Sequence, residues 1–401
     1  MSENPYIRIG TSYYKIVKYP TISGDYIETI ILWSIEAIRQ DESKDLISQI
    51  PKYDGFTCIP NHVDYRHVYG TFYNTYAPLS VKPVPGSISF TENFLRHIFG
   101  KQFELGLDYL QLLYLKPTQI LPILCLVSRE RATGKSTFLK WLKCVFESNM
   151  TYLTNDSFSS QFNADWANKL LICIDEVLFN KEELTERIKY LSTTNINKME
   201  AKGKDRREVE FFGKFVLCSN NEESFIKIDA DEIRFWIIKV PRADRDDTSL
   251  LEKLAAEIPA FLHFLRHRTI SVPEPLSRMW FSVEQIRTKA LMKLIHSNRD
   301  RVEKELAHML LSVMEQLELT EVQACPLDLL NLLQKVRVKA DQSSIRRILK
   351  SWQIQPRNNT FAYQRVIPTY DGGFYLHSDK GRYYTITRAF LTVNFDELMT
   401  E

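Results

Sequence analysis

The stretch that decides the fold reads Ile123-Leu-Cys-Leu-Val-Ser-Arg-Glu-Arg-Ala-Thr-Gly134-Lys135-Ser136-Thr137-Phe138. Its first residues are apolar and predict a buried strand, a polar loop follows, and residues 138–146 have the spacing of an amphipathic helix. The backbone N–H groups of such a loop, together with the helix N-terminus, form a cradle for a polyanion. Lys135 can neutralise phosphate charge and the Ser136 hydroxyl can bind Mg²⁺, so the stretch predicts a nucleoside triphosphate site.

One residue departs from the usual G-x-x-x-x-G-K-[ST] pattern, because Arg129 stands where the first glycine is expected. A residue other than glycine has fewer allowed backbone conformations, so it is the first turn of the loop whose conformation can differ from the usual pattern. Taken alone, the Gly-Lys-Ser-Thr match also fits an ordinary strand-to-helix turn. The residues expected to surround the phosphates are Arg131, Ala132, Thr133, Gly134, Lys135, Ser136 and Thr137.

Composition narrows the class of protein. With 401 residues, the chain is long enough for two or three domains, and its 44% hydrophobic and 25% charged residues are typical of a soluble globular protein. The net charge of +2 does not by itself indicate nucleic-acid binding, so only local clusters of lysine and arginine can indicate it. The six cysteines have no C-x-x-C spacing and the longest apolar runs are too short to cross a bilayer. We therefore expect a cytoplasmic protein without disulfides, zinc or membrane contact.

The middle of the chain alternates apolar strands with helices, which predicts an α/β fold with a central, mainly parallel five-stranded sheet flanked by helices. The strands are expected at 121–127, 150–153, 170–174, 215–218 and 234–240. The helices are expected at 135–147, 157–168, 182–193 and 249–266.

The flanking regions have different patterns. The first 85 residues predict a small α+β region with strands near 6–9 and 13–17, a helix over 27–39 and a proline-rich linker at 77–86. Helices are expected at 91–99, at 105–115 and within 281–318. At the end, helices over 326–336 and 343–352 precede strands over 363–367 and 383–387, with turns at Asp371-Gly-Gly and Asp379-Lys-Gly between them. A helix-turn-helix followed by a β-hairpin predicts a winged-helix domain.

A second chemical signal is Leu170-Leu-Ile-Cys-Ile-Asp175-Glu176, a buried strand that ends in two carboxylates. Asp175 is placed to join Ser136 in the Mg²⁺ shell, and Glu176 to orient and deprotonate an attacking water. A strand that merely ends in acidic residues is common, but it is uncommon at this distance after a Gly-Lys-Ser-Thr loop.

Two further strands carry polar residues at one end. Asn220 follows the apolar run 215–218, where its amide can bond the γ-phosphate and the attacking water, although such an asparagine is often only a turn residue. Arg234 begins the last strand of the set and can reach the γ-phosphate of a neighbouring subunit. The alternative for Arg234 is an ordinary ion pair with Asp231 or Glu232.

Two basic clusters point to nucleic acid. The alternating segment 198–210 predicts a β-hairpin whose apex carries Lys202 and Lys204, with Arg206 beside it, although a charged hairpin is often only a solvated turn. Over 335–365, eight basic residues face one acidic residue, and Arg346, Arg347 and Lys350 lie on the second predicted C-terminal helix. Such a helix can face phosphates or base edges, or the domain can serve protein contacts instead.

Taken in order, the Gly-Lys-Ser-Thr loop, the Ile-Asp-Glu strand end, the lysine-tipped hairpin and the Ser-Asn strand end resemble a superfamily 3 helicase. Within that AAA+-like group the chain resembles the helicase part of phage, plasmid and poxvirus-type primase-helicases. The resemblance covers about residues 90–270 closely and the C-terminal tail loosely. It implies an ATP- and Mg²⁺-dependent DNA helicase that forms a hexameric ring around single-stranded DNA during replication of a phage or mobile element.

Carried over to this sequence, the resemblance implies a Walker A loop at Gly134, Lys135 and Ser136 and a Walker B strand end at Asp175 and Glu176. It implies a sensor role for Asn220, pore-loop roles for Lys202 and Lys204, and a role in trans for Arg234 as an arginine finger. The implied domains are an N-terminal region at 1–85, a helical collar at 86–118, the ATPase domain at 119–270, a helical connector at 271–320 and a winged-helix domain at 321–401. Single-stranded or forked DNA, other copies of the chain and a separate primase or polymerase are the expected partners.

Other interpretations fit the same motifs. The protein can be an AAA+ initiator or DNA-remodelling ATPase that does not unwind processively, a packaging ATPase, or a viral RNA helicase. Displacement of a strand from a forked duplex separates the helicases from the initiator and packaging proteins, and ATPase stimulation by single-stranded DNA or RNA separates the two kinds of helicase.

Overall fold

The computed structural model describes residues 4–20, 26–179, 181–200, 202–203, 205–229, 232–243, 247–272, 274, 277–299, 301–335, 338–370 and 372–395. The chain divides into two units, one formed by Met1–Ile226 and Ile233–Leu291, the other by Lys227–Glu232 and Met292–Glu401. Each unit has a core of buried apolar side chains of its own. The sequence-based division into five segments is finer than this and stays a prediction.

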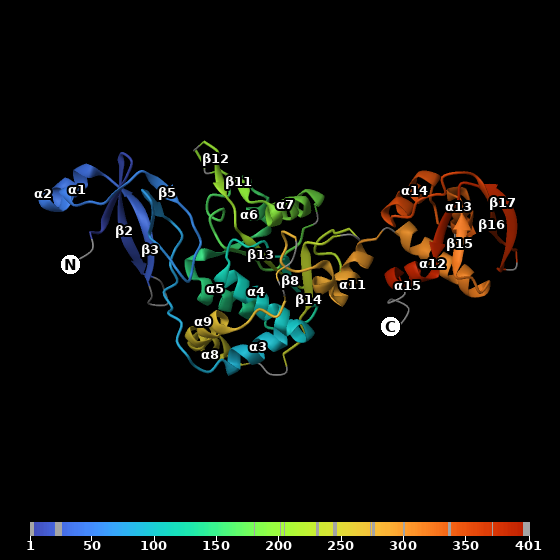
Figure 1. The fold of residues 1–401 in the computed structure, drawn as a ribbon, viewed down its shortest axis with the longest axis horizontal. Helices are drawn as coiled ribbons and strands as arrows, with labels where there is room; N and C mark the ends of the chain where they lie inside the picture. The colour runs from blue at the N-terminus through green and yellow to red at the C-terminus, as the bar shows by residue number, and fades with distance from the viewer. Residues whose placement is uncertain are drawn as a thin grey trace. The chain divides into compact units, whose positions relative to one another are not determined.

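The first unit is built on a five-stranded sheet (Figure 1). All neighbouring strands pair in parallel, in the order β14-β8-β13-β10-β9. Buried side chains along β8, β10 and β13 explain why their sequences are continuous apolar runs rather than alternating ones. The prediction of a parallel five-stranded sheet is therefore confirmed. The strands are β8 (Ile123–Val127), β9 (Met150–Leu153), β10 (Leu171–Ile174), β13 (Lys214–Ser219) and β14 (Phe235–Lys239).

Helices flank this sheet and bury its faces (Figure 1). Trp236 of β14 stacks on Phe99 of α3 with ring centroids 5.5 Å apart, and Phe138 of α5 meets the same Phe99 edge-on. The helices in the part of this unit that contains the sheet are α3 (Ser89–Phe99), α4 (Phe103–Leu115), α5 (Lys135–Phe146), α6 (Asn155–Ser159), α7 (Glu182–Thr193), α8 (Leu250–Ala256), α9 (Ile258–His267) and α10 (Val283–Ile286). Short 3-10 turns, η1 (Gly100–Gln102) and η2 (Glu147–Asn149), follow α3 and α5.

The helix expected over 157–168 is wrong for most of its length. Only α6 is helical, and turns follow it. Asn163 accounts for this, because its side chain donates to the Lys198 carbonyl (2.9 Å) and accepts from the Glu200 N–H (2.8 Å). A short polar side chain that bonds distant backbone in this way competes with helix formation.

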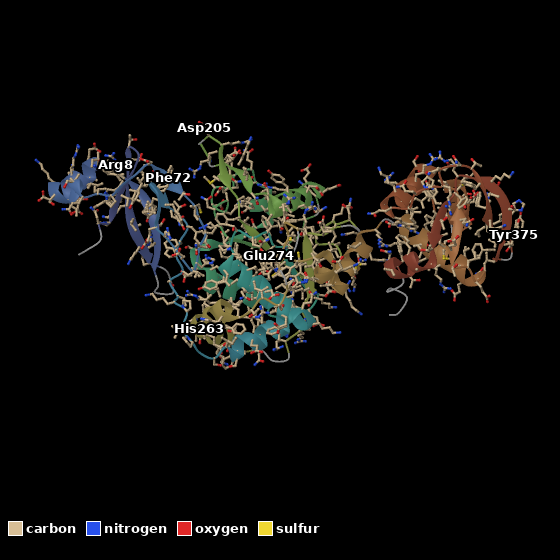
Figure 2. The ribbon with its side chains drawn as sticks, in the orientation of Figure 1. Arg8, Phe72, Asp205, His263, Glu274 and Tyr375 are labelled. Carbon is tan, nitrogen blue, oxygen red and sulfur yellow. The ribbon has the colours of Figure 1, made fainter. Side chains whose placement is uncertain are left out.

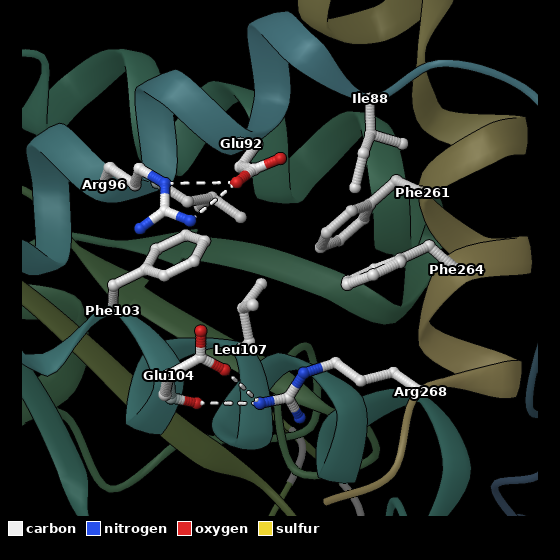
Figure 3. Close-up of a pocket in the computed structure, with 10 residues that line it drawn as sticks. Ile88, Glu92, Arg96, Phe103, Glu104, Leu107, Phe261, Phe264 and Arg268 are labelled. Carbon is white, nitrogen blue, oxygen red and sulfur yellow. Dashed lines mark hydrogen bonds and ion pairs between the residues drawn. The ribbon is translucent and has the colours of Figure 1, made fainter. Parts of the chain in front are cut away.

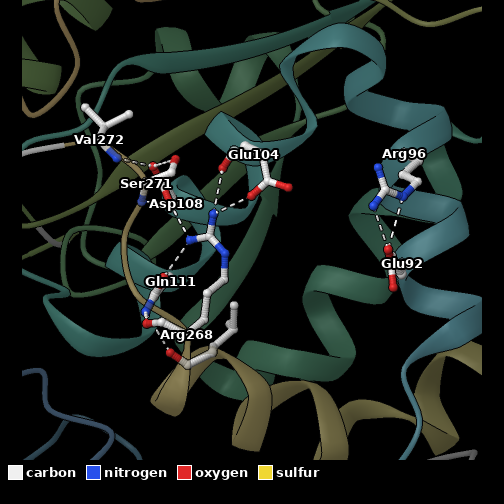
Figure 4. A network of polar contacts seen from close by, with 9 residues as sticks. Glu92, Arg96, Glu104, Asp108, Gln111, Arg268, Ser271 and Val272 are labelled. Atoms are coloured by element: carbon white, nitrogen blue, oxygen red, sulfur yellow. Dashed lines mark hydrogen bonds and ion pairs between the residues drawn. The ribbon is translucent and has the colours of Figure 1, made fainter.

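A buried polar network joins α4 to the end of α9 (Figure 4). Asp108 is fully buried and forms an ion pair with Arg268, which also donates to Gln111 (2.8 Å) and to the Glu104 carboxylate (2.8 Å). The second oxygen of Asp108 accepts from the Ser271 hydroxyl (2.6 Å) and the Val272 N–H (3.0 Å). Since each buried charge has a partner, the network can tolerate burial.

Beside this network lies a cavity of about 150 Å³ between α3, α4 and α9 (Figure 3). Phe103, Phe261 and Phe264 form much of its wall, and the exposed Arg96–Glu92 pair borders it. None of residues 128–137 lines this cavity, so it is separate from the predicted nucleotide site.

The N-terminal part of the first unit holds two small sheets. One has the order β3-β2-β1-β4 and the other the order β5-β7-β6. The strands are β1 (Tyr6–Ile9), β2 (Ser12–Pro20), β3 (Tyr26–Trp33), β4 (Lys52–Tyr53), β5 (Gly55–Thr57), β6 (Val68–Tyr69) and β7 (Phe72–Asn74). The helices are α1 (Ile35–Asp41) and α2 (Lys44–Ser48).

The helix predicted over 27–39 is wrong at its start. Residues 26–33 form β3, which pairs with β2 along its whole length, and the helix begins only at Ile35, where the Ser34 hydroxyl caps it. The run 27–31 holds three isoleucines and a threonine, whose β-branched side chains favour a strand once a partner strand is present.

The proline-rich residues 77–86 contain neither helix nor strand, as predicted, and hydrogen bonds attach them to the rest of the first unit. The side chain of Asn149 bonds the backbone of Ala77 at both N–H (3.2 Å) and C=O (2.9 Å). Further along, the Val84 N–H donates to the Pro259 carbonyl (3.0 Å).

The segment predicted to be helical over 281–318 contains α10, α11 (Lys289–Asn298) and α12 (Arg301–Gln316). The rest of the second unit follows in the order β15 (Glu321–Ala324), α13 (Pro326–Lys335), α14 (Gln342–Ser351), β16 (Phe361–Pro368), β17 (Phe374–Gly381), β18 (Tyr384–Thr387) and α15 (Arg388–Phe395). The two predicted helices are confirmed, but the strand pairing differs. β16 pairs with β17, which contains the expected turn at Asp379, whereas β18 pairs with β15. The local sequence pattern could not predict that β18 pairs with β15, because β15 precedes both helices in the chain.

Among the described residues, no helix is both long and apolar enough to cross a membrane.

Candidate nucleotide site

The predicted site residues follow the carboxyl ends of neighbouring strands. The 128–135 loop connects β8 to α5, Asp175 and Glu176 follow β10, and Asn220 follows β13. Because the strands are parallel and β8, β13 and β10 are consecutive in the sheet, these residues lie together at the carboxyl-terminal ends of the strands. Ligands of open α/β sheets bind at these ends.

Contacts between these strand ends hold them together. The Ser128 N–H donates to the Ser219 carbonyl (3.2 Å), and the Ser219 hydroxyl donates to the Val177 carbonyl (3.1 Å). The ends of β8, β13 and β10 are thereby joined, and Asn220 is exposed directly beyond this junction.

Lys135 is the first residue of α5 and is buried at the base of the loop. Its ammonium donates to the Thr133 hydroxyl (3.1 Å) and lies 3.4 Å from the Ser128 carbonyl. Burial lowers the pKa of Lys135, and the negative charges of Asp175 and Glu222 partly oppose that shift. Among the described residues, no carboxylate bonds this buried ammonium directly, so it is suited to pair with a phosphate.

The loop backbone is shaped as an anion cradle. Ala132 and Gly134 adopt left-handed conformations, with φ of 55° and 85°. The Ala132 carbonyl accepts from the Ala243 N–H (3.1 Å) and the Thr133 carbonyl lies 3.0 Å from Nε2 of His97, so both are held by other segments. Within the described residues, the N–H groups of 131–134 donate to no protein acceptor. Such free, successive N–H groups bind phosphate oxygens.

Ser136 and Asp175 meet at the mouth of the loop. The Ser136 hydroxyl donates to Oδ2 of Asp175 (2.8 Å), and both side chains are exposed. Oxygen ligands of these two kinds are those that Mg²⁺ prefers, and two protein ligands leave room for waters and phosphate oxygens. The pair therefore fits the predicted metal site.

Glu176 has a left-handed backbone, with φ of 57°, which is rare for a residue other than glycine. Asn155, at the start of α6, holds this conformation: its Nδ2 donates to the Glu176 carbonyl (3.3 Å) and its Oδ1 accepts from the Leu178 N–H (3.2 Å). Strain of this kind clusters at functional sites, and the exposed Glu176 carboxylate is free to face a ligand at these strand ends. The role of Asn155 was missed by sequence reasoning, since the contact spans 21 residues.

Arg129 does not strain the loop. It has no left-handed backbone, so the position does not require glycine here. Its N–H donates to Oε1 of Glu222 (3.0 Å) and its guanidinium forms an ion pair with Glu223. Glu222 is buried and was missed by sequence reasoning, because no motif points to it.

Arg234 lies at the opposite end of the strands, where their amino termini are. Its carbonyl accepts from the Ile123 N–H (2.8 Å), at the amino ends of β14 and β8. The structure therefore does not bring Arg234 to the other site residues of its own chain. Of the two acids suggested as alternative partners, Glu232 is buried and Asp231 lies outside the described residues.

The hairpin predicted within 198–210 is present. It consists of β11 (Ile196–Met199) paired antiparallel with β12 (Arg207–Glu210). Lys202 and Arg206 are exposed near the apex, where Figure 2 labels Asp205, whereas Lys204 lies outside the described residues. The Arg206 guanidinium is bonded to Glu200 (2.6 Å), a pairing that sequence reasoning did not anticipate.

In the second unit, α14 has a basic face. Arg346, Arg347 and Lys350 are exposed, while Ile345 and Leu349 on the other face are fully buried. The helix is thus anchored by its apolar side and presents its cations to solvent, and the predicted contact of these cations with nucleic acid stays a prediction.

The fold and the site define an α/β protein with a parallel sheet and a basic loop-to-helix junction at the carboxyl-terminal ends of its strands. Residues 126–234 match the family described as "Family of unknown function (DUF5906)", which is a minority of the chain. The solved apo structure of the NrS-1 C-terminal region (residues 305–718) is similar over 95% of both chains, with 16% identity and a TM-score of 0.62. A second form of the same region gives 16% identity, 95% coverage of both chains and a TM-score of 0.60. At this identity the likeness concerns the fold, and no curated protein sequence matches the chain.

Proposed function

We propose that this chain is an ATP-dependent DNA helicase of superfamily 3, which acts as a ring on single-stranded DNA during replication of a phage or mobile element. The observation that carries the proposal is the contact between the Ser136 hydroxyl and the Asp175 carboxylate, at 2.8 Å, beside the buried Lys135. Ser136 and Asp175, which are 39 positions apart, thus place two oxygen donors next to a buried cation, and this supports the proposed Mg²⁺ and phosphate roles. The likeness to the NrS-1 C-terminal region supports the same assignment of fold.

In this proposal the loop N–H groups and Lys135 bind the triphosphate. Ser136 and Asp175 hold Mg²⁺, which neutralises charge on the phosphates. Glu176 accepts the proton of the attacking water, and Asn220 bonds the γ-phosphate or that water.

The hairpin is connected to the site by the chain itself. Three residues separate the end of β12 at Glu210 from the start of β13 at Lys214, and Asn220 directly follows β13. Movement of the strand end that contacts nucleotide is therefore passed to Lys202, Lys204 and Arg206, which we propose hold the DNA backbone. The exposed cations of α14 supply a second nucleic-acid contact.

Arg234 acts in trans in this proposal. β14 contains five residues. At about 3.3 Å per residue, such a strand separates its amino-terminal end from its carboxyl-terminal end by roughly 17 Å, which is longer than an arginine side chain. In a ring, a finger at the amino-terminal end can serve the site of the next protomer.

The test is unwinding of a forked duplex by the purified chain with ATP and Mg²⁺, compared with Lys135→Ala. We expect strand displacement and ATPase stimulated by single-stranded DNA, and a loss of turnover by about 10²-fold or more in Lys135→Ala, because the phosphates lose their buried cation. Lys140→Ala, which removes an exposed cation of the same helix, is the matched control.

Different outcomes identify the other candidates. ATP-dependent DNA binding without displacement indicates an initiator or remodelling ATPase, and stimulation by single-stranded RNA alone indicates an RNA helicase. Normal turnover in Lys135→Ala contradicts the nucleotide site.

A further inference from the structure

Arg129 contacts the loop after β13 through both its backbone and its side chain. The backbone N–H donates to Glu222 at 3.0 Å, and the guanidinium pairs with the next residue, Glu223. These contacts join residues 93 and 94 positions apart. A glycine at this position, as in the usual pattern, would keep the first contact and lose the second.

Glu222 extends the connection to a third strand. Its Oε1 is occupied by the Arg129 N–H, and its Oε2 lies 3.3 Å from the ammonium of Lys239, the last residue of β14. The Glu222 side chain is 4% exposed, whereas that of Lys239 is 59% exposed. A carboxylate this deeply buried requires charged or N–H partners, so its geometry is tightly constrained.

Side-chain hydrogen bonds hold the loop that carries the two glutamates. Oδ1 of Asn221 accepts from the N–H groups of Glu223 (3.0 Å) and Ser224 (2.9 Å), which forms an Asx turn. The Asn221 N–H donates to the Ser219 hydroxyl (3.1 Å), which in turn donates to Val177 after β10. Asn220 lies between these fixed points, so whatever holds Glu222 and Glu223 also positions Asn220.

We propose that Arg129, Glu222, Glu223 and Lys239 form an ionic latch that holds the start of the 128–135 loop against the Asn220 loop, and that Arg129 is thereby a positioning residue for hydrolysis. This inference rests on the proposed function and specifies how its site is aligned. The arginine replaces a glycine's conformational freedom with an ionic anchor. Because Arg129 is largely exposed, its pair adds little to global stability and acts mainly on alignment.

The test is a charge exchange between Arg129 and Glu223. Arg129→Glu and Glu223→Arg are each expected to lower kcat for ATP by roughly tenfold with little change in KM, and the double variant to recover most of that loss. Arg129→Gly, which restores the usual glycine, is expected to resemble the single variants. Lys140→Glu is the matched charge control, and equal melting temperatures exclude unfolding as the cause.

A second readout needs no nucleotide. In the nucleotide-free protein, amide hydrogen exchange over 128–135 and 219–224 should speed up in both single variants and return toward the wild-type rate in the double variant. Recovery in exchange supports the latch even if no ATP is hydrolysed, in which case the proposed function fails separately. If the double variant is no better than the single ones in either readout, or if the single variants match wild type in both, the latch is wrong.

Discussion

At the scale of single residues, the site joins a short local motif with partners that are remote in sequence. Gly134, Lys135 and Ser136 were identifiable because their chemistry depends on consecutive positions in one turn. Their predicted approach to Asp175 is consistent with the observed 2.8 Å contact. Glu222, Asn155 and His97 were not identifiable, since each acts on the site from another segment and belongs to no local pattern.

The lowered pKa of Lys135 leads to a prediction about pH. Burial reduces the pKa of this lysine below 10.5, and a bound triphosphate must raise it by adding negative charge beside the ammonium. ATP should therefore bind most tightly below the pKa that Lys135 has in the empty site, and the affinity should fall as pH rises through that pKa. Between this pKa and the higher pKa of Lys135 in the ATP complex, binding should take up a proton.

Titration calorimetry from about pH 7 to about pH 10, in buffers with different ionisation heats, measures that uptake. Lys140→Ala should retain the uptake. Binding by the wild type that releases protons, or that exchanges none across the range, contradicts the assignment of Lys135 as the phosphate partner.

At the scale of elements, apolar runs predicted most strands, and errors arose where pairing decided the outcome. β3 was mistaken for helix because its isoleucines fit both periods, and pairing with β2 settled the matter. In the second unit the sequence of β17 predicts turns, since it contains Gly381 and few apolar residues, yet β17 pairs with all of β16. α6 ended early because Asn163 bonds the β11 backbone instead.

The network between α4 and α9 gives a stability prediction. Asp108→Asn should reduce the free energy of unfolding by about 3 kcal/mol, because it removes the fully buried carboxylate paired with Arg268 and leaves that nearly buried guanidinium with only the exposed Glu104 as charge partner. Glu92→Gln, at the exposed pair with Arg96, is the control and should cost under about 1 kcal/mol. Urea unfolding followed by circular dichroism measures the free energy of unfolding of both variants. If the two variants lose the same free energy, the buried pair does not stabilise the protein more than the exposed one.

At the scale of the whole molecule, the sheet places the 128–135 loop and Arg234 at opposite ends of its strands. Under the proposed function, each copy contributes this loop to one site and Arg234 to the site of a neighbouring copy. The helix α14, whose exposed cations are the other proposed nucleic-acid contact, belongs to the second unit.

Mixing variants tests action in trans. Arg234→Ala should retain ATP binding and lose about 10³-fold in kcat, since the transferring phosphate loses its external charge partner. Adding Glu176→Gln protein should restore part of the ATPase activity, because a Glu176→Gln copy still offers Arg234 to an intact neighbouring site. The double variant Arg234→Ala, Glu176→Gln should restore none. Mixtures that stay inactive at every ratio would make Arg234 a structural residue.

The amino-acid sequence by itself determined the central strands, the loop-to-helix junction at Lys135 and the basic hairpin, because periodicity, turn chemistry and consecutive ligands act over a few residues. Only the tertiary structure decided the strand order, the pairing of β15 with β18, and the contact of Arg129 with Glu222 across 93 positions. Those features depend on which distant segments are brought together when the whole chain closes around its cores, and no short window of sequence carries that information.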